Sequence, residues 1–323
     1  MIKGKKILFI GTGFYDYEND IKKQFEDRGA IVYHFSSVLS SWIKRILDIL
    51  GLHVLASKSL SGRLQKLIEE QPDDIDFIFI IRGENFQEKH IAQLERKYPN
   101  KKTVFYTWDT TQNLPNWELI HSHFDNILTF DRVDAEKYNL KFRPLYYRVN
   151  VQNEQLPIIY DVSFVGKSYT NRDLLLSMLK KQLENAGLTF KFILVKTKLR
   201  YFVERFVTRK IKKEDEELYI TSTIDYNEYL RISLQSNVIL DIPTLGQNGL
   251  TMRTIESIGL NKKLLTTNRD IKNYNFDDSC FRLLDACNPS IDMSFIKCRD
   301  SCRYEKEFYS EKCFINDILA CFM

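Results

Sequence analysis

One stretch of the chain combines a flexible loop, a cation and a carboxylate within a few residues. Gly246–Gly249 contains two glycines that can take positive φ angles, and Thr251 is a residue type that begins helices. The first-turn amides of such a helix, the positive end of its dipole and Arg253 would together favour an anionic ligand, above all a phosphate. Glu256 follows Arg253 by one helical turn, where its carboxylate could accept a hydrogen bond from a sugar hydroxyl. The candidate ligand-binding residues of this stretch are Gln247, Asn248, Gly249, Leu250, Thr251, Arg253 and Glu256.

Two strands and one helix are predicted to hold this stretch in place. Val238–Ile242 is an apolar run typical of a buried strand, and Pro243 ends it because proline cannot donate to a sheet ladder. The helix spans Thr251–Gly259, with apolar residues at helical spacing, and Lys263–Thr267 is the next predicted strand. The loop and the first helical turn should therefore lie at the carboxyl end of a buried strand.

A second glycine turn with a cation is predicted in the same half of the chain. The strand Val162–Val165 is followed by Gly166-Lys167-Ser168. Gly166 would let the backbone approach a phosphate, and Lys167 would supply a positive charge. This turn is not a Walker loop, because the upstream glycine is missing. Further predicted elements are a helix over Arg172–Ala186, a strand over Thr189–Val195 and a helix over Tyr226–Gln235.

The first half of the chain alternates strands and helices in the pattern of a parallel sheet. The predicted strands are Lys6–Ile10, Ile31–Phe35, Asp76–Ile81, Thr103–Tyr106 and Asn126–Phe130, with a helix over Asn19–Arg28. Ligands of open α/β sheets collect at the carboxyl ends of the strands, so acidic residues there are candidate general bases. Asp109 is our first choice, followed by Asp16 and Glu84. The alternative for Asp109 is a helix N-cap.

Three other sequence patterns are weaker evidence for a cofactor or metal site. Gly11-Thr-Gly13 begins a G-x-G-x-x-G motif, but Asp16 replaces its third glycine, which argues against a nicotinamide or flavin site. Asp74-Ile-Asp76 matches a D-x-D metal motif but precedes a strand, where we interpret it as a turn cap. His121 and His123 would point about 200° apart on a helix and cannot share a metal ion there. We predict no metal site and no cofactor.

Length and composition limit the class of protein. A chain of 323 residues suits two domains of about 150 residues each, and 44% apolar with 28% charged residues is an ordinary folding composition. The net charge of +4 is too small to argue for nucleic acid, which is not a predicted partner. We see no signal peptide and no apolar run of roughly 18 residues, so we expect a cytoplasmic protein. The six cysteines all lie at or after Cys280 without paired CxxC spacing, and we expect reduced thiols.

The segment Glu256–Asn268, ESIGLNKKLLTTN, resembles the E-A-x-x-x-G-x-P-V-x-x-T segment in the C-terminal domain of GT-B glycosyltransferases. Together with Gly249–Glu256 it is similar to bacterial surface-polysaccharide transferases and to the spore-coat CgeB-like branch. The resemblance implies a GT-B fold, with two Rossmann-like parallel-sheet domains facing a cleft, and a glycosyltransferase that needs no metal ion. It also implies that Glu256 holds the ribose of a nucleotide-sugar donor, while Arg253, Lys167 and the loop hold its phosphates.

The resemblance is incomplete at a point that bears on mechanism. Many retaining members carry a second glutamate seven or eight positions upstream, where this chain has Gly249 and Asn248. The stereochemical outcome therefore stays open. An inverting reaction would need one of the candidate bases Asp109, Asp16 and Glu84. The implied acceptor is a hydroxyl of a cell-surface polysaccharide or of a lipid-linked oligosaccharide precursor.

We expect the chain to divide into two domains and a C-terminal tail. The apolar periodicity is lost over Leu145–Pro157, which we interpret as a linker. Residues 1–156 would form an N-terminal acceptor domain and residues 157–303 a C-terminal donor domain. The tail 304–323 is predicted to be helical over Tyr304–Phe322, and the resemblance suggests that it crosses back to the N-terminal domain.

Two basic and apolar segments favour contact with an anionic membrane. Val38–Ala56 contains Trp42–Leu50 with an apolar helical face, and Lys196–Lys213 has eight basic residues against one acidic residue. Clustered Lys and Arg each gain on the order of 1 kcal/mol near an anionic leaflet, which suggests peripheral binding at the inner face of the plasma membrane. The alternative is that both segments are ordinary amphipathic helices.

Two other functions stay open from sequence. The same fold could serve a transferase of another activated phosphosugar, such as phosphoribosyl diphosphate, or a catalytically silent protein that binds a nucleotide sugar. The structural alternative for the predicted helix is an ordinary βαβ crossover with a surface ion pair between Arg253 and Glu256.

Overall fold

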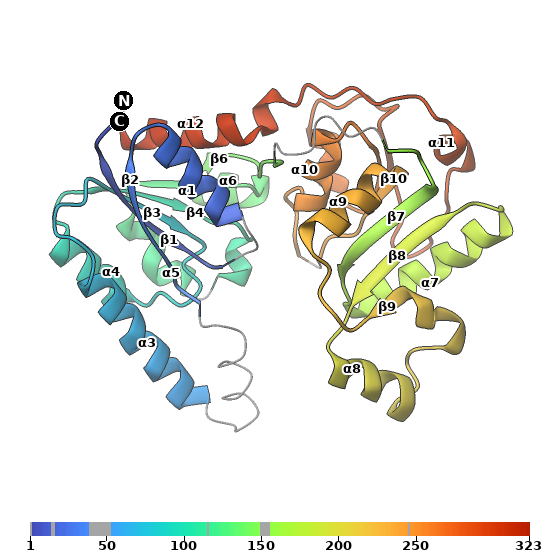
Figure 1. Ribbon diagram of the computed structural model, residues 1–323, viewed down its shortest axis with the longest axis horizontal. Coiled ribbons are helices and arrows are strands. Elements are labelled where there is room, and N and C mark those ends of the chain that lie inside the picture. Colours follow the sequence, from blue (N-terminus) through green and yellow to red (C-terminus); the bar gives the residue numbers. More distant parts are fainter. Residues whose placement is uncertain (1, 14–16, 39–52, 115, 149–155, 245) are drawn as a thin grey trace. The chain divides into compact units, whose positions relative to one another are not determined.

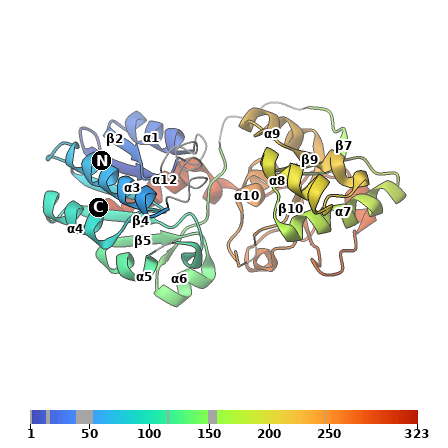
Figure 2. The same cartoon turned by 90° about the horizontal axis from the view of Figure 1, so that it is seen from below.

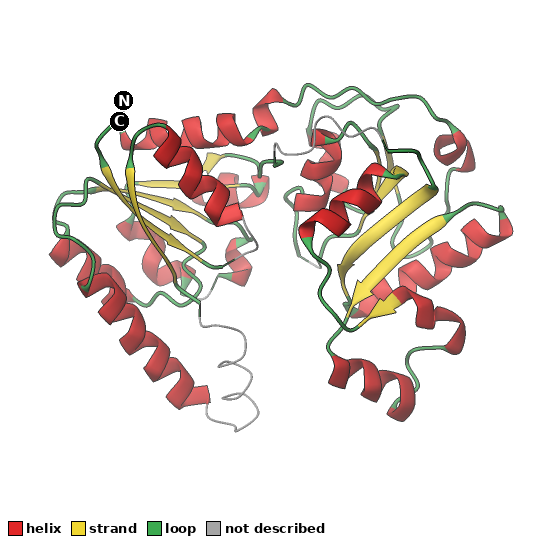
Figure 3. Ribbon diagram, viewed as in Figure 1, coloured by secondary structure: helices red, strands yellow, loops and turns green. Residues whose placement is uncertain are grey.

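The computed structural model of the chain describes residues 2–13, 17–38, 53–114, 116–148, 156–244 and 246–323. The chain divides into two compact units, each with its own sheet (Figures 1 and 3). Unit 1 comprises Met1–Leu145, Gln247–Gly249 and Tyr309–Met323, and unit 2 comprises Tyr146–Gly246 and Leu250–Phe308. Among the described residues, no helix is long and apolar enough to cross a membrane.

Unit 1 contains a six-stranded parallel sheet in the order β2-β1-β3-β4-β5-β6. The strands are β1 (Lys6–Gly11), β2 (Ile31–Ser36), β3 (Phe77–Ile81), β4 (Lys102–Tyr106), β5 (Asn126–Thr129) and β6 (Lys141–Phe142). The helices are α1 (Tyr17–Asp27), α3 (His53–Glu69), α4 (Glu88–Lys97), α5 (Trp117–Ile120), α6 (Arg132–Tyr138) and α12 (Glu311–Phe322).

Successive residues of the unit 1 strands face opposite sides of the sheet and meet different helices. On one side, Ile78 of β3 belongs to a buried cluster with side chains of α3, α4 and α5. On the other side, the ring of Phe79 lies 6.0 Å from that of Phe25 in α1, and Phe77 stacks on Phe322 of α12 at 4.6 Å between centroids. The C-terminal helix therefore contributes to the core of unit 1, and helices cover both faces of its sheet (Figure 2).

Unit 2 contains a second six-stranded parallel sheet in the order β12-β11-β10-β7-β8-β9. The strands are β7 (Tyr160–Lys167), β8 (Phe190–Val195), β9 (Tyr219–Ile220), β10 (Ser236–Asp241), β11 (Lys263–Thr266) and β12 (Phe281–Leu283). The helices are α7 (Thr170–Asn185), α8 (Lys198–Phe202), α9 (Tyr226–Leu234), α10 (Met252–Gly259) and α11 (Met293–Lys297).

The central strand β10 is buried along its whole length. Its Val238 pairs with Val162 of β7 on one side and with Lys263 of β11 on the other. Side chains of α7 and α11 pack on one face of the sheet, and Ile232 of α9 packs on the opposite face against Val165 of β7. Because all strands are parallel, the segments that follow β7 and β10 begin at the same edge of the sheet.

The predicted fold class, an α/β protein with two Rossmann-like parallel sheets, is confirmed. The strand ending before Pro243, the helix capped by Thr251 and the strand from Lys263 are confirmed within one or two residues. These elements were predictable because local apolar periodicity and local breakers determine them.

Three predicted boundaries are wrong. Gly166 and Lys167 are the last residues of strand β7 rather than a turn after it, because their pairing with β8 continues to the end of the strand. The tail helix begins at Glu311, not at Tyr304, because Ser310 caps it and accepts from the amide of Cys313. The segment Lys196–Lys213 is not one continuous helix: it contains the short helix α8 and a π-helical turn over Val203–Val207, and Lys213 begins a 3-10 helix. Residues 39–52, with the predicted Trp42–Leu50 helix, lie outside the described residues.

Candidate functional site

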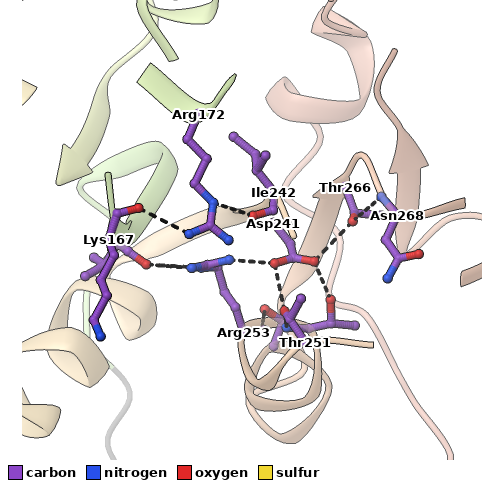
Figure 4. Close-up of polar contacts among 11 residues, drawn as sticks. Lys167, Arg172, Asp241, Ile242, Thr251, Arg253, Thr266 and Asn268 are labelled. Atoms are coloured by element: carbon purple, nitrogen blue, oxygen red, sulfur yellow. Dashed lines mark hydrogen bonds and ion pairs between the residues drawn. The ribbon is translucent and has the colours of Figure 1, made fainter. Parts of the chain in front are cut away.

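A fully buried carboxylate, Asp241, ends strand β10 and organises the polar side chains around it (Figure 4). Its Oδ1 accepts a hydrogen bond from Thr251 Oγ1 at 2.8 Å, and its Oδ2 accepts from Thr254 Oγ1 at 3.0 Å and from Thr266 Oγ1 at 3.3 Å. Arg253 Nη1 lies 2.6 Å from Asp241 Oδ1. The buried negative charge thus has a cation and three hydroxyl donors, which is the compensation that a buried carboxylate requires.

The start of α10 is fastened to the end of β10 through Thr251. As N-cap, Thr251 Oγ1 accepts a hydrogen bond from the amide of Thr254 at 3.3 Å. The same hydroxyl donates to Asp241. One side chain therefore ends the loop, begins the helix and fixes both to the strand, so that Arg253 leaves the helix at a defined position.

Arg253 reaches from the first turn of α10 to strand β7. Its Nε and Nη2 donate to the carbonyl oxygen of Val165 at 3.1 and 2.9 Å, and its guanidinium lies 4.4 Å from the ring centroid of Phe164. A Cβ on Gly166 would come within 2.8 Å of Arg253 Nη2 and 3.0 Å of the Phe164 ring. Glycine at position 166 therefore leaves room for the guanidinium, a close approach that the sequence did not reveal.

A second guanidinium, that of Arg172 in the first turn of α7, lies beside the first (Figure 4). Its Nε donates to Ile242 O at 2.7 Å, and its Nη1 donates to Lys167 O at 3.2 Å. Burial, and after it the positive charge of Arg253, lowers the pKa of Arg172 to about 10. Asp241 is the one carboxylate in the described part of the chain that hydrogen-bonds to either arginine, and it does so through Arg253, so the two guanidinium groups together keep a net positive charge.

The carboxyl edge of the unit 2 sheet is therefore positively charged. Lys167 ends β7 with its carbonyl oxygen bonded to Arg172, and its exposed side chain adds a positive charge at the end of this strand. Open α/β sheets bind ligands outside the carboxyl ends of their strands, and guanidinium groups bind phosphate oxygens through strong charge-assisted hydrogen bonds. Chemically, this arrangement can stabilise the charge of a phosphate group.

Glu256 has a different partner from the one expected. Its carboxylate is buried, and Tyr226 Oη of α9 donates to Glu256 Oε1 at 3.0 Å. Burial, followed by the charge of Glu256, raises the pKa of Tyr226, so the phenol stays protonated and acts as the donor. The guanidinium of Arg148 lies 4.4 Å from the Tyr226 ring centroid. The idea of a surface ion pair between Arg253 and Glu256 is wrong, because Glu256 is buried and Arg253 is paired with Asp241.

Two loop amides that were expected to face a ligand have protein partners. Within unit 1, the amides of Asn248 and Gly249 lie 3.3 and 3.2 Å from Asp131 Oδ2. A Cβ on Gly249 would come within 2.6 Å of an aromatic ring, so this glycine allows close packing. Gln247 is half-buried and Leu250 is buried. The amides of Asn248 and Gly249 are thus already occupied by a carboxylate of unit 1.

In unit 1, two of the three candidate bases surround one arginine. Arg82 follows β3, and its Nη2 lies 3.2 Å from Asp109 Oδ2 while its Nη1 lies 3.8 Å from Glu84 Oε2. Asp109 Oδ1 accepts from the amide of Thr110 at 2.9 Å and from Asn113 Nδ2 at 3.0 Å. The sequence predicted both acids at strand ends but did not indicate Arg82 as their common partner.

The backbone after β3 and β4 is strained. Arg82 has a φ of 60° and Trp108 a φ of 51°, and neither is a glycine. Such conformations cost on the order of 1–3 kcal/mol each and concentrate at active sites and ligand clamps. This strain adds to the case for the Arg82 cluster as part of a site. Asp16, the third candidate base, lies outside the described residues.

The glycine loop after β1 is closed by a carboxylate from its own helix. Glu18 Oε1 accepts from the amides of Thr12 and Gly13 at 2.5 and 2.8 Å, and Glu18 Oε2 lies 3.1 Å from His34 Nε2. A Cβ on Gly11 would fall 1.9 Å from Glu18 Oε2. A phosphate at this loop would have to displace a carboxylate from the amides that bind it, which argues against a dinucleotide site here.

Sequence reasoning missed the two residues that complete the unit 2 cluster, Asp241 and Arg172. Asp241 did carry a signal, because it is a single acid inside the apolar run Val238–Ile242. Arg172 had none, since its partners come from other elements. Across the described ranges, no group of three or more His, Cys, Asp or Glu side chains could hold a metal ion.

No protein-family model and no curated protein matches the chain. Several solved structures are similar. An alpha-glucosyltransferase in complex with UDP and a mismatched 13-mer DNA has 14% identity and a TM-score of 0.57, with 98% of this chain and 95% of that chain covered. A UDP-GlcNAc 2-epimerase of Methanocaldococcus jannaschii, in complex with UDP-GlcNAc and UDP, has 11% identity and a TM-score of 0.58, with 98% of both chains covered.

A third similar structure is Alr3699/HepE of Anabaena in complex with UDP and glucose, with 12% identity, a TM-score of 0.59 and 98% of both chains covered. At such identities the likeness concerns the fold alone. The similarity covers 98% of this chain and therefore includes both units with their parallel sheets. The chain therefore has the GT-B fold.

Proposed function

We propose that this chain is a glycosyltransferase that moves a sugar from a nucleotide-sugar donor to a hydroxyl of a cell-surface polysaccharide or of a lipid-linked oligosaccharide precursor. The observation that carries the proposal is the pair of neighbouring guanidinium groups at the ends of β7 and β10, where Arg253 is bonded to Asp241 and Arg172 to the carbonyl oxygen of Ile242. Guanidinium groups suit a diphosphate because each can donate more than one hydrogen bond to its oxygens. The fold shared with structures that contain UDP supports the same conclusion.

The unit 2 residues receive the following roles in this proposal. Arg253, Arg172 and Lys167 bind the donor diphosphate, and Glu256 accepts hydrogen bonds from the ribose. The amides of Asn248 and Gly249 already donate to Asp131, so the phosphates depend chiefly on the cations. As the sugar leaves, the same cations and the N-terminus of α10 stabilise the charge that develops on the diphosphate, and no metal ion is needed for that step.

For an inverting reaction we assign Asp109 as the general base, ahead of Glu84 and Asp16. Arg82 forms an ion pair with this carboxylate, so Arg82 must move away for Asp109 to reach the acceptor hydroxyl. Asp109→Asn should then abolish transfer while nucleotide binding is retained. A variant that transfers sugar at the wild-type rate would exclude Asp109 as the base.

Nucleotide binding tests the donor site directly. Lys167→Ala is the most informative variant, because Lys167 is exposed, whereas loss of Arg253 would leave the buried charge of Asp241 unpaired and cost about 3–5 kcal/mol of stability. Calorimetry with UDP, GDP, CDP and dTDP should show one preferred nucleotide, bound about ten- to a hundredfold more weakly by Lys167→Ala. Lys191→Ala removes an exposed lysine of the neighbouring strand β8 and is the matched control. Equal affinity in both variants would exclude Lys167 from the site.

Turnover assays separate the alternative functions. A nucleotide sugar that is bound but neither hydrolysed nor transferred would indicate a silent binding protein. Turnover of phosphoribosyl diphosphate alone would indicate the other transferase class. Because one structure of this fold is a UDP-GlcNAc 2-epimerase, the products should also be analysed for epimerised sugar.

A further inference from the structure

An exposed apolar face follows strand β8 in unit 2. Helix α8 continues directly into the π-helical turn Val203–Val207, and Figure 1 shows α8 beyond the edge strand β9. Five large apolar side chains of this segment are between 37% and 75% exposed: Leu199, Phe202, Val203, Phe206 and Val207. Their spacing of three and four residues places them on one side of the helical segment. We call these five residues the α8 face.

The segment is fixed to unit 2 at both ends, so its exposure does not come from a loose helix. Before α8, the buried Lys196 Nζ lies 2.8 Å from Asp173 Oδ2 and forms an ion pair with Glu204. After the π-helical turn, Ile211 is buried, and its amide donates to Glu204 O at 3.1 Å. The α8 face is therefore presented in a constant orientation, with its apolar side chains directed away from the core that holds it.

Basic residues lie within and on both sides of the α8 face in the sequence. Residues 196–213 contain eight basic residues and one acidic residue, a net charge of +7, and the four acids that follow at 214–217 lower the net charge of 196–217 to +3. The single acid of 196–213, Glu204, is already paired with Lys196 and with Arg200, whose Nε lies 2.7 Å from Glu204 Oε1. Five exposed basic residues have no ion-pair partner within the described ranges: Lys198, Arg209, Lys210, Lys212 and Lys213. The segment thus combines exposed hydrophobic area with exposed basic side chains and a net positive charge.

We propose that the α8 face docks unit 2 onto an anionic lipid surface. Phenylalanine and leucine side chains enter the boundary between headgroups and acyl chains, while the surrounding lysines and arginine bind the lipid phosphates. The positive charge of this segment favours an anionic lipid surface over a second copy of the chain. A second copy of the chain would bring two surfaces of like charge together, which is repulsive. A nucleic acid would bring its phosphates into contact with the apolar side chains at the centre of the α8 face, whereas phosphates require cations as partners.

Vesicle flotation of the purified full chain tests this proposal. The probes are vesicles of phosphatidylcholine alone and of phosphatidylcholine with an equal part of phosphatidylglycerol, at low and at high salt. We expect the chain to float with the anionic vesicles at low salt and to be released at high salt, because salt screens the attraction. The double variant Phe202→Ser with Phe206→Ser should lower the partition coefficient at least about tenfold, since two exposed rings lose their burial in lipid.

The matched control for the aromatic residues is Leu174→Ser, which removes an exposed leucine from α7 in the same unit. For charge, Lys210→Gln with Lys212→Gln should weaken binding to anionic vesicles, whereas Lys181→Gln with Lys191→Gln should not. Thermal melting of each variant verifies that it is folded. The assay contains neither nucleotide nor acceptor, so its outcome does not depend on the proposed transfer reaction.

Four results would overturn the proposal. The first is that the wild-type chain fails to float, and the second is that it floats equally well with neutral vesicles. The third is that the phenylalanine variant floats normally but changes the oligomeric state in gel filtration, which would make the face an interface between copies. The fourth is tight binding to duplex DNA that competes with vesicles and is unaffected by the phenylalanine changes.

Discussion

The polar cluster of unit 2 is held together by two arginine side chains and one aspartate side chain. Arg172 stays protonated at neutral pH, because a pKa of about 10 is still well above 7. Together with Arg253 it carries two positive charges against the single charge of Asp241. An anionic ligand would complete the pairing of these buried groups, which is the physical reason to expect a phosphate there.

The role of Glu256 can be tested with a variant of nearly the same size. If Glu256 accepts hydrogen bonds from the donor ribose, Glu256→Gln should weaken donor binding about ten- to a hundredfold, because hydrogen bonds to charged groups contribute about 1.5–3 kcal/mol. The amide side chain of this variant keeps an oxygen that can accept from Tyr226, so the melting temperature should change little. Tyr226→Phe is the control for positioning and should weaken binding less. A stable Glu256→Gln protein with unchanged donor affinity and activity would remove α10 from the donor site.

Lys262 should make stability depend on alkaline pH. Burial lowers its pKa to about 8, and its Nζ donates to Leu234 O at 2.6 Å. The pKa of a lysine in the unfolded chain is about 10.4. Between the pKa of the folded state and that of the unfolded state, the unfolded state binds more protons, so the free energy of unfolding rises with pH. Lys262→Met removes this contribution. Its gain in stability over the wild type should be largest below pH 8 and should shrink by roughly 1–2 kcal/mol towards about pH 9.5.

Urea denaturation of both proteins at about pH 7 and at about pH 9.5 measures this difference. Groups that titrate in both proteins cancel in the comparison, so only Lys262 contributes. A difference that stays constant between the two pH values would show that the ammonium group is not destabilised by burial.

At the scale of elements, the site depends on where β7 and β10 end relative to each other. Ser236, Val238 and Ile239 of β10 pair with residues of β7, so both strands deliver their carboxyl ends to the same edge of the sheet. Arg253 then spans from the helix after β10 to the backbone of β7. The parallel pairing therefore decides which carbonyl oxygen the guanidinium can reach.

A methyl group on β7 should disturb this arrangement. In Gly166→Ala the new Cβ would lie 2.8 Å from Arg253 Nη2, so the guanidinium must move away from Val165 O. We expect nucleotide affinity to fall about tenfold or more, with a loss of stability of about 1–3 kcal/mol from overpacking. Gly62→Ala in α3, where no atom lies within 4 Å of the new Cβ, should leave binding unchanged and gain up to about 1 kcal/mol. Wild-type affinity in Gly166→Ala would show that the position of Arg253 is not essential.

At the scale of the whole molecule, unit 1 is built from both ends of the chain. Asp317 of α12 pairs with the buried Arg143 at 2.7 Å, and Lys102 Nζ donates to the carbonyl oxygen of Met323 at 2.8 Å. These contacts join residues that are far apart in sequence. Unit 1 therefore needs the last helix of the chain for a complete core, whereas unit 2 has a separate core of its own.

Phe314 tests this dependence. It is fully buried in α12, with its ring 5.0 Å from that of Tyr106 in β4, so Phe314→Ala should cost about 3–5 kcal/mol of stability in unit 1. Met323→Ala, at the exposed end of the same helix, should change stability by less than about 0.5 kcal/mol. Urea unfolding measures both effects. If unit 2 binds the nucleotide, the nucleotide should still stabilise the Phe314→Ala protein. An equally small loss of stability in both variants would contradict the role of α12 in the core of unit 1.

The sequence by itself determined the elements. The apolar run Val238–Ile242, the break at Pro243 and the cap at Thr251 act within a few residues of each other, so their consequences appear in any local window. For the same reason the sequence predicted alternating strands and helices in its first half, and hence a parallel sheet there, while the resemblance to GT-B glycosyltransferases implied the second sheet. It also placed Asp109 and Glu84 at strand ends, because the end of an apolar strand is a local feature.

Only the tertiary structure decided the partners. Asp241 is bonded to Arg253, and Arg253 to the carbonyl oxygen of Val165, 88 residues earlier in the chain. The same holds for Tyr226 with Glu256 and for Arg82 with Asp109. Residue types and spacing determine which segments become strands and helices. Which charges compensate one another is determined only when distant strands pair and exclude water, because the cost of an unpaired buried charge exists only in the folded protein.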